Sequence, residues 1–336
     1  MGLTLKELSQ LAGCSIRTVN RVLWHNGTVS SATRERVEAL LREHHYVPNM
    51  AARNLKQSQR KFAGVIVDSS RTAQIFLRKL SDLVARLAGY GFTPLLGGSV
   101  DTPEELANAL GQWSGLLDHV LFMNMPRPAV LAALPELCAR FALQFTVMDA
   151  VGELPPEVSA LYIEREAGIA AAVKCLHRLG HRRILRVGDL SSRDRGWENG
   201  RAAVDASVQF HHIAAEADCG SAEAAGAQVV AWRPDAVFCD TDRAAAGILR
   251  YALAHGYSVP QDFSLVGFDD DPVASMLFPR LSTVAHPVES LNAAAAEIVA
   301  AGRGGSRVVR RFATEFVPRE SIASRLEDGA HTPPEK

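Results

Sequence analysis

The 336-residue sequence contains only five cysteines, few aromatic residues and no long apolar run. The cysteines are odd in number and no C-x-x-C pair occurs. This pattern indicates neither a disulfide framework nor a zinc site, and it suits a reducing compartment. No stretch approaches the roughly 18 uninterrupted apolar residues of a membrane span, and the first residues lack the apolar run of a signal peptide. We therefore expect a cytoplasmic protein with no membrane partner.

The sequence also lacks the residue patterns that would identify an enzyme, a cofactor site or a metal site. Neither Gly97-Gly98 nor Gly304-Gly305 belongs to a phosphate-binding G-x-G-x-x-G motif, and no Ser–His–Asp set can be singled out. The run Asp269-Asp270-Asp271 lacks the alternating spacing and downstream Glu of a calcium loop. We interpret it as a turn at a strand end, and His211-His212 as a surface pair. We expect no enzymatic activity, no cofactor and no metal.

Charge is distributed unevenly along the chain, although its net value is only −1. Residues 1–61 contain ten Lys and Arg against four Glu, which gives +6; the remainder contains 26 basic and 33 acidic residues, which gives −7. A basic head on an acidic body suits a phosphate-binding module attached to a domain that does not bind phosphates. A basic terminus that is merely solvated is the simpler alternative.

Residues 4–23 predict two short helices joined by a turn at Gly13. Thr4 and Ser15 are the expected N-caps, because a hydroxyl can accept a hydrogen bond from a free backbone N–H of the first turn. The residues expected to face inward are Leu5, Leu8, Leu11 and Ala12 in the first helix and Ile16, Val19 and Leu23 in the second. The outer face of the second helix consists of Arg17, Thr18, Asn20 and Arg21. Two apolar faces that meet across a short turn form a helix-turn-helix, whose second helix can enter a major groove of DNA.

From Phe62 onward, short apolar strands alternate with helices. Strands are predicted at 62–68, 91–96, 119–123, 144–149, 183–188, 236–239 and 263–268. Helices are predicted at 75–88, from 102 onward, and at 128–140, 166–179, 195–208, 220–231 and 242–255. This alternation indicates βαβ units and doubly wound parallel sheets. Because it comes in two similar halves, we expect two sheets that face each other across a cleft, with a ligand at the carboxyl ends of their strands.

Several motifs together resemble the lactose-repressor (LacI/GalR) family of bacterial transcription regulators. The family pattern T-[IL]-x-[DE]-[VL]-A-x-x-A-G-V-S-x-x-T-V-S-R-V-L matches residues 4–23, and L-G-H-R-R-I, P-D-A-V-F-C-D-T-D and V-P-Q-D-F-S-L-V-G-F-D-D follow in family order at 179–184, 234–242 and 259–270. The chain departs from this opening pattern at Ser9, Gln10, Cys14 and Asn20. It also departs from the family at Trp24, His45 and Thr241, where the usual residues are Asn, Gly and Asn. Asn20 and Trp24 lie where base or phosphate contacts are expected, so the operator sequence does not carry over from the family.

The resemblance implies an N-terminal all-α helix-turn-helix DNA-binding domain and an α/β effector domain like that of type I periplasmic binding proteins, with two doubly wound parallel-sheet subdomains. We expect a DNA-binding domain at 1–47, a hinge helix or linker at 48–61, an effector-binding and dimerisation domain at 62–325 and a disordered tail at 326–336. Within the effector domain, we expect the N-subdomain at about 62–161 plus 288–318 and the C-subdomain at about 162–287 plus 319–325. The tail shows no heptads, which argues against a coiled-coil tetramerisation helix.

The function implied is that of a transcriptional repressor. Such a protein binds a pseudo-palindromic operator as a homodimer, is associated with the nucleoid when bound, and responds to a small effector such as a sugar, a polyol or a sugar acid. The alternative is a solute-binding protein of the periplasmic-binding type without a role on DNA. That alternative does not explain the basic head.

The residues expected to contact DNA share either a place on the second helix or a match to the family's phosphate-contacting positions. They are Thr4, Ser15, Ile16, Arg17, Thr18, Asn20, Arg21, Ser30, Thr33, Tyr46, Asn49, Ala52 and Leu55. Arg17, Thr18, Asn20 and Arg21 are expected to contact the groove and phosphates, and an arginine can read guanine through two hydrogen bonds. Phosphate contacts are expected from Ser15, Ser30, Thr33, Tyr46 and Asn49. By resemblance, Leu55 of each subunit is a wedge in a minor-groove step, so Leu55→Ala is expected to weaken operator binding and spare effector binding.

The residues expected to line the effector pocket follow predicted strands. They are Ser70, Arg71, Gln74, Ile75, Asp149, Arg193, Arg195, Trp197, Cys219 and Asp242. Counting back from Gly196 selects Arg193 as the pocket arginine of the family, and counting back from Gly200 selects Trp197, so the alignment stays open. Asp242 can equally serve as an N-cap, and Arg195 as a solvated residue. Ala217-Asp218-Cys219 stands where many relatives carry an aromatic ring, which weakens the case for a pyranose or purine.

Overall fold

The computed structural model describes residues 5–23, 27–44, 62–67, 74–113, 115–302 and 305–326. The chain divides into two compact units, Met1–Arg60 and Lys61–Lys336, which we call the head and the body. Among the described residues, no helix has both the length and the apolar composition needed to span a membrane.

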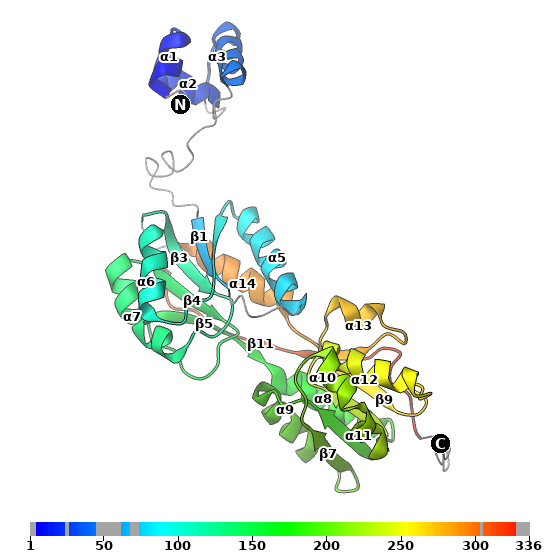
Figure 1. Ribbon diagram of the computed structural model, residues 1–336. Coiled ribbons are helices and arrows are strands. Elements are labelled where there is room, and N and C mark those ends of the chain that lie inside the picture. The colour runs from blue at the N-terminus through cyan, green and yellow to red at the C-terminus, as the bar shows by residue number, and fades with distance from the viewer. Residues whose placement is uncertain are drawn as a thin grey trace. The chain divides into compact units, whose positions relative to one another are not determined.

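The head contains α1 (Leu5–Leu11), α2 (Ile16–Leu23) and α3 (Ser31–Glu43). Its small core is formed by Leu8, Ala12, Val19, Val22 and Val37. Gly13 has a φ of +60° in the turn between α1 and α2, a conformation that glycine adopts without steric cost. The predicted helix-turn-helix is therefore present, and a third helix packs against it (Figure 1).

Two residues predicted to face inward do not. Leu11 is 55% exposed and Ile16 is 43% exposed. At 100° per residue, Leu5 and Ala12 lie on one side of the buried Leu8, and Leu11 lies on the other. The buried face of α1 is therefore turned away from Leu11. Ile16 is the first residue of α2, and the helix buries Val19 and Val22 instead.

The first sheet of the body has six strands in the order β11-β5-β4-β3-β1-β2. We call the part built on it the N-subdomain. Its strands are β1 (Phe62–Ile66), β2 (Thr93–Gly97), β3 (Leu117–Phe122), β4 (Gln144–Met148), β5 (Val158–Glu164) and β11 (Val309–Ala313), all parallel to their neighbours. Its helices are α5 (Gln74–Gly89), α6 (Pro103–Gln112), α7 (Pro128–Phe141) and α14 (Val288–Ala301). Helices α5 and α14 cover one face of the sheet and α6 and α7 the other (Figure 1), and their side chains complete a hydrophobic core on each face.

The second sheet also has six strands, in the order β12-β10-β9-β8-β6-β7. It forms the C-subdomain. Its strands are β6 (Arg183–Val187), β7 (Gln209–Ile213), β8 (Ala236–Cys239), β9 (Ser264–Asp269), β10 (Ser282–Ala285) and the antiparallel β12 (Glu315–Val317). Its helices are α8 (Arg165–Arg178), α9 (Ser191–Ala202), α10 (Cys219–Ala224), α11 (Gly226–Ala231), α12 (Asp242–Ala254) and α13 (Pro272–Met276).

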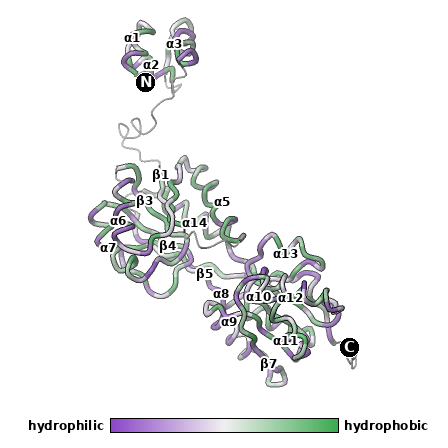
Figure 2. Tube along the Cα trace, in the orientation of Figure 1, coloured by the Kyte–Doolittle hydropathy of each residue, from purple (hydrophilic) through white to green (hydrophobic). Residues whose placement is uncertain are grey.

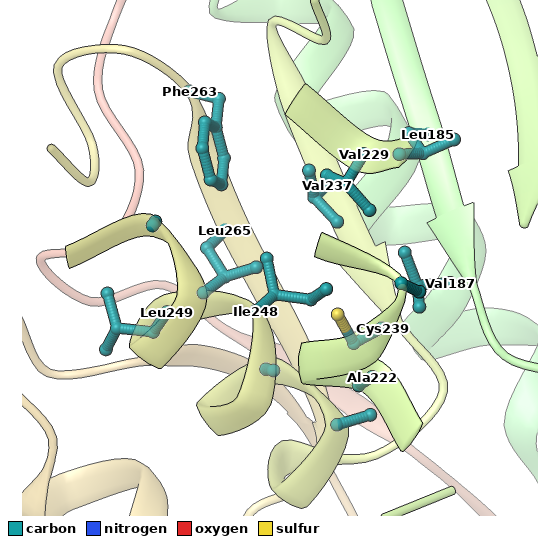
Figure 3. Packing of buried hydrophobic residues seen from close by; sticks show 14 of the residues in the cluster. Leu185, Val187, Ala222, Val229, Val237, Cys239, Ile248, Leu249, Phe263 and Leu265 are labelled. Carbon is teal, nitrogen blue, oxygen red and sulfur yellow. The ribbon is translucent and has the colours of Figure 1, made fainter. Parts of the chain in front are cut away.

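Hydrophobic cores fill both faces of each sheet. Figure 3 shows one of them, in which Val187, Val237 and Leu265 of the second sheet meet Ile248 and Leu249 of α12. Along the tube in Figure 2, the strands of the first sheet are mainly hydrophobic and the helices around them are more mixed. Strands buried on both faces read as nearly continuous apolar runs, which is why the alternation was recognisable in the sequence.

The chain passes between the two subdomains at Glu164–Arg165, between Ala285 and Val288, and at Thr314. Thr314 is 4% exposed, and its hydroxyl lies 3.0 Å from the carbonyl of Glu164 and 3.2 Å from that of Arg165. The same hydroxyl accepts a hydrogen bond from the backbone N–H of Gly168. Two of the three crossing segments are thereby tied together. Because β12 belongs to the second sheet, the last crossing comes earlier than the expected boundary near residue 318.

Several predicted boundaries were wrong. The helix predicted at 195–208 is α9, which begins at Ser191 and ends at Ala202, so that β7 follows. The helix predicted at 220–231 is two short helices, α10 and α11. Gly226 opens the second of them against the ring of Tyr251, where an added Cβ would lie 2.1 Å from Cγ.

Candidate functional site

Helix α2 of the head presents a polar outer face. Arg17 is exposed, and Thr18, Asn20 and Arg21 are partly exposed. The hydroxyl of Ser15 accepts a hydrogen bond from the backbone N–H of Thr18 (3.1 Å), so Ser15 serves as the expected N-cap. The exposed Ile16 lies at the start of the same helix. This face offers two guanidinium groups, an amide and a hydroxyl, which are the groups that read base edges and bind phosphates.

The neighbouring segment supports that face. Ser30 caps α3 by accepting from the backbone N–H of Thr33 (3.4 Å), and its hydroxyl donates to the hydroxyl of Thr33 (2.9 Å). Gly27 has a φ of +142°, and a Cβ there would lie 3.2 Å from Cδ of Arg21. The stem of Arg21 therefore packs against this loop. Five predicted contact residues lie outside the described part of the chain: Thr4, Tyr46, Asn49, Ala52 and Leu55.

In the body, a group of buried charged side chains lies where the two subdomains meet. We call it the charged cluster, and it consists of Lys79, Asp149, Arg165, Arg193, Asp269 and His286. At Asp149 of the N-subdomain, Nη2 of Arg165 from α8 donates to both carboxylate oxygens at 2.6 Å, and Nζ of Lys79 lies 3.8 Å from Oδ2. At Asp269 of the C-subdomain, the carboxylate lies 3.4 Å from Nη2 of Arg193 and 3.2 Å from Nε2 of His286 in a crossing segment.

The two carboxylates of the cluster occupy unusual backbone positions. Asp149 directly follows β4 with a φ of 55°, and Asp269 ends β9 with a φ of 112°. Non-glycine residues in this region cost roughly 1–3 kcal/mol each and concentrate at functional sites. Both carboxylates stand at the carboxyl ends of parallel strands, where α/β sheets bind ligands.

Burial shapes the protonation of the cluster. Burial alone would raise the pKa of Asp149, but Lys79 and Arg165 together hold that pKa below its ordinary value. Burial raises the pKa of Asp269 to about 6, even though Arg193 and Lys79 oppose the change. Burial and then the charges of Lys79 and Arg193 lower the pKa of His286 well below its ordinary value, so this imidazole is neutral.

Arg193 is held in place by several contacts. Its guanidinium carbon lies 3.6 Å from the centroid of the Phe268 ring, and its Nε donates to the backbone carbonyl of Asp240 at 3.3 Å. Asp240 is itself fully buried and accepts two hydrogen bonds from Arg186 at 2.8 Å, with a third from the backbone N–H of Leu190. Arg186 and Asp240 therefore position the loop that leads into α9.

The structure places the other predicted pocket residues differently. Arg195 is 83% exposed and lies 3.6 Å from Glu166, and it lines a separate open cavity of about 670 Å³ together with Arg165. Trp197 is 4% exposed in the hydrophobic core, edge-on to Phe210. Cys219 begins α10 and is half-buried. Of the three candidates on α9, only Arg193 reaches the charged cluster.

Asp242 is not the N-cap of its helix, because Thr241 takes that role. The Asp242 carboxylate accepts hydrogen bonds from the hydroxyl of Thr283 (2.6 Å) and the backbone N–H of Asp271 (2.8 Å). Burial raises its pKa well above the ordinary value. Through these two hydrogen bonds, the Asp242 side chain holds the turn after β9 in place. Ile75 is buried at the start of α5; Ser70 and Arg71, and the side chain of Gln74, lie outside what the structure describes.

A cavity of about 480 Å³ opens at the carboxyl ends of β1, β2 and β3. Its lining includes Asn124, whose side-chain oxygen Oδ1 is buried without a hydrogen-bond partner. Strands β3 and β4 are neighbours, with Phe122 opposite Val147. Asn124 and Asp149 therefore follow adjacent strand ends at the same edge of the sheet.

Sequence reasoning missed five residues of this site: Lys79, Asn124, Arg165, Asp269 and His286. Asp269 was interpreted as part of a turn, although its place at the end of an apolar strand was the signal that could have found it. A lysine on an amphipathic helix normally lies in solvent, so Lys79 carried no such signal. Within the described ranges, no group of three or more His, Cys, Asp or Glu side chains is placed to hold a metal ion.

Comparisons with known proteins agree with these observations. Residues 4–49 match the model of the bacterial regulatory proteins of the lacI family, and residues 173–322 match a periplasmic binding protein-like domain. The chain is 30% identical to an HTH-type transcriptional repressor PurR of Escherichia coli over 86% of both chains. It is 28% identical to the HTH-type transcriptional regulator GalR of Escherichia coli over 98% of both.

A crystal structure of the Lac repressor dimer has a similar fold, with a TM-score of 0.77 at 22% sequence identity. The match covers 96% of this chain and all of that one. The helix-turn-helix head, the two parallel sheets and the repressor relatives lead to one assignment: the chain belongs to the lacI family of DNA-binding transcriptional regulators.

Proposed function

We propose that this regulator is a repressor that binds a pseudo-palindromic operator as a homodimer and is controlled by a small hydroxylated effector. The Lac repressor of the comparison is a dimer bound to operator and to an anti-inducer. The observation that carries the proposal is one chain with both a polar helix-turn-helix face and a buried charged cluster at the carboxyl ends of two sheets. The proposal places the protein in the cytoplasm, on the nucleoid, and gives it no catalytic role.

On DNA, we propose that Arg17, Thr18, Asn20 and Arg21 contact base edges and phosphates of the major groove. The caps Ser15 and Ser30, with Thr33, suit phosphates at the helix N-termini, where backbone N–H groups also point outward. The remaining predicted contacts, Leu55 as a minor-groove wedge among them, are part of the same proposal.

In the body, we propose that the effector binds between Asp149 and Arg193, next to the cavity that Asn124 lines. Effector and operator then affect each other through a coupling free energy, typically 1–3 kcal/mol. A sugar, a polyol or a sugar acid fits a site with both hydrogen-bond acceptors and charged donors.

The test begins with selection of operator sequences from a random duplex library, followed by fluorescence anisotropy on the selected duplex. We expect sequence-selective binding that weakens steeply with salt. Arg17→Ala is expected to cost about 1–3 kcal/mol of operator affinity. Arg178→Ala removes an exposed arginine of α8 and serves as the matched control.

A protein that binds no duplex more tightly than random DNA would contradict the proposed repressor. In that case, the alternative of a solute-binding protein without a role on DNA would gain support from ligand binding alone.

A further inference from the structure

The charged cluster holds more positive than negative charge. Within the part of the chain that the structure describes, its cations are Lys79, Arg165 and Arg193, its carboxylates are Asp149 and Asp269, and His286 is neutral. The relative exposure of these side chains is 13% or less. Among the described residues, one buried positive charge of the cluster therefore lacks a partner.

The other described acids around the cluster do not balance this charge. Asp270 pairs with Arg319 at 2.5 Å. Asp242 accepts hydrogen bonds from Thr283 and from the backbone of Asp271, and burial favours its neutral form. The side chain of Asp271 has its own neighbours Arg243 and Arg78. Arg78 in turn donates to Glu289 at 2.8 Å and to the carbonyl of Asp270 at 3.1 Å.

Each of the three cations has at least one donor that is bonded loosely or not at all among the described residues. Nζ of Lys79 lies 3.8 Å from its carboxylate partner, which is beyond hydrogen-bond distance. The Arg193–Asp269 distance of 3.4 Å is at the outer limit of a hydrogen bond, and Nε of Arg165 is buried without a partner. Buried charges and donors that lack a partner are strongly unfavourable, so we expect these donors to bind a group other than the described residues.

The site is poorly suited to a flat apolar ring. Arg193 covers the Phe268 ring at 3.6 Å, so that face is already occupied. The segment at Asp218 offers no ring, and the Asp218 carboxylate is used to cap α10 through the N–H groups of Gly220 and Ser221. By contrast, the unpaired oxygen of Asn124 can accept a hydrogen bond from a ligand hydroxyl.

We propose that the effector is a small polyhydroxy carboxylic acid, whose carboxylate pairs with Lys79 and Arg193 and whose hydroxyls face Asn124. This inference rests on the proposed function for its site and narrows the effector to one class. The excess of one positive charge in the cluster is neutralised by the single negative charge of a carboxylate. A phosphate monoester, with a charge of about −2 near neutral pH, would leave a negative excess.

The test compares acids with neutral counterparts on the unaltered full chain at constant ionic strength. The pairs are D-gluconate with D-sorbitol and D-glucuronate with D-glucose, and D-glucose 6-phosphate is the phosphate arm. Binding to the folded state raises the melting temperature, so we expect at least one acid to raise Tm above both its neutral partner and the phosphate. Calorimetric titration then measures the affinity of that acid.

A panel in which no acid exceeds its neutral partner overturns the inference, and a preference for the phosphate ester overturns the carboxylate assignment. Lys79→Met is expected to weaken the acid about tenfold or more and to weaken its neutral partner less. Arg86→Met is the matched control, because Arg86 pairs with Asp82 on the same helix and lies outside the cluster. An unchanged acid affinity in Lys79→Met would also count against the inference.

Measuring operator affinity with and without each ligand distinguishes a failure of this inference from a failure of the proposed function. If a neutral polyol binds best and alters operator affinity, the repressor proposal stands and the carboxylate inference fails. If acids bind through Lys79 but no operator can be selected, the inference stands and the repressor proposal fails.

Discussion

A buried histidine illustrates what a single residue contributes to this fold. His181 follows α8 and is fully buried. Its Nδ1 donates to the carbonyl of Leu176 at 2.8 Å, and its Nε2 accepts from the hydroxyl of Ser264, also at 2.8 Å. Ser264 in turn accepts from the backbone N–H of Ala323. The neutral imidazole therefore joins α8, β9 and the segment after β12.

Burial lowers the pKa of His181 from 6.5 to about 4. Between these values, the unfolded chain takes up a proton that the folded chain does not, so acidification favours unfolding. We expect the free energy of unfolding to fall as pH drops from 6.5 toward 4, with a contribution from His181 of about 3 kcal/mol at most. Above pH 6.5, we expect no pH dependence from this residue. Urea titrations at pH 7, 6 and 5 measure this.

His181→Gln is expected to lower stability at pH 7 and to flatten the pH dependence. His255→Gln, at an exposed position after α12, is the control. Equal pH dependence in the wild type and His181→Gln would show that the histidine is not responsible.

The three candidates on α9 show the limit of prediction for single residues, because the sequence did not decide which of them reaches the charged cluster. Arg193, Trp197 and Gly200 lie on one buried face of α9, since they are spaced four and three residues apart. The sequence identified this face as a source of pocket residues. It could not tell that the first of the three reaches the cluster while Trp197, one turn later, packs in the core, because that depends on the start of α9 at Ser191.

At the scale of elements, the alternation of apolar strands with helices predicted seven strands: β1, β2, β3, β4, β6, β8 and β9. It did not predict β5, β7, β10, β11 and β12 as strands. The last two, β11 and β12, are short and carry Arg310, Arg311 and Glu315, and β11 is largely exposed. Their pairing is set by β5 and β10 across the sheets, and a sequence pattern does not contain such contacts. The buried Lys79 was missed for the same reason.

The crossing between the subdomains depends on a close helix approach at Gly168. A Cβ at Gly168 would lie 2.5 Å from Cγ1 of Val284 and 2.6 Å from Oγ1 of Thr314. Alanine in a helix is normally about 1 kcal/mol better than glycine. Here we expect Gly168→Ala to destabilise the body by about 1–3 kcal/mol, because the neighbours must shift.

Gly111→Ala provides the matched comparison, since nothing lies within 4 Å of a Cβ at that position of α6. We expect this substitution to be neutral or to raise stability by up to about 1 kcal/mol. Thermal denaturation of both variants measures the difference. A Gly168→Ala variant as stable as Gly111→Ala would disprove the close approach.

At the scale of the whole molecule, exposed apolar residues indicate how two copies can pair. Met276 at the end of α13 is 79% exposed, and Phe278 is 88% exposed. Apolar side chains exposed together are typical of interaction surfaces, and closed two-fold dimers are the commonest assembly of a single chain. We propose this face as part of the dimer interface.

Phe278→Ser is therefore expected to weaken dimerisation and, because two half-sites are bound together, to lower operator affinity without changing ligand binding. Sedimentation velocity over a range of concentrations measures the first effect and anisotropy the second. Leu253→Ser, at a 59% exposed position on α12, is the control. If Phe278→Ser remains as dimeric as the control, this face is not the interface.

The order in which the chain adds strands to the two sheets has a consequence for synthesis on the ribosome. The strands latest in sequence, β11 and β12, complete one sheet each, and α14 covers the first sheet shortly before them. A nascent chain that has already produced β5 and β10 still leaves one edge of each unpaired, and uncovered edges invite mispairing with other chains. Both sheets are completed only when residues 309–317 have been synthesised, so we expect neither half of the body to reach its final stability before the last part of translation.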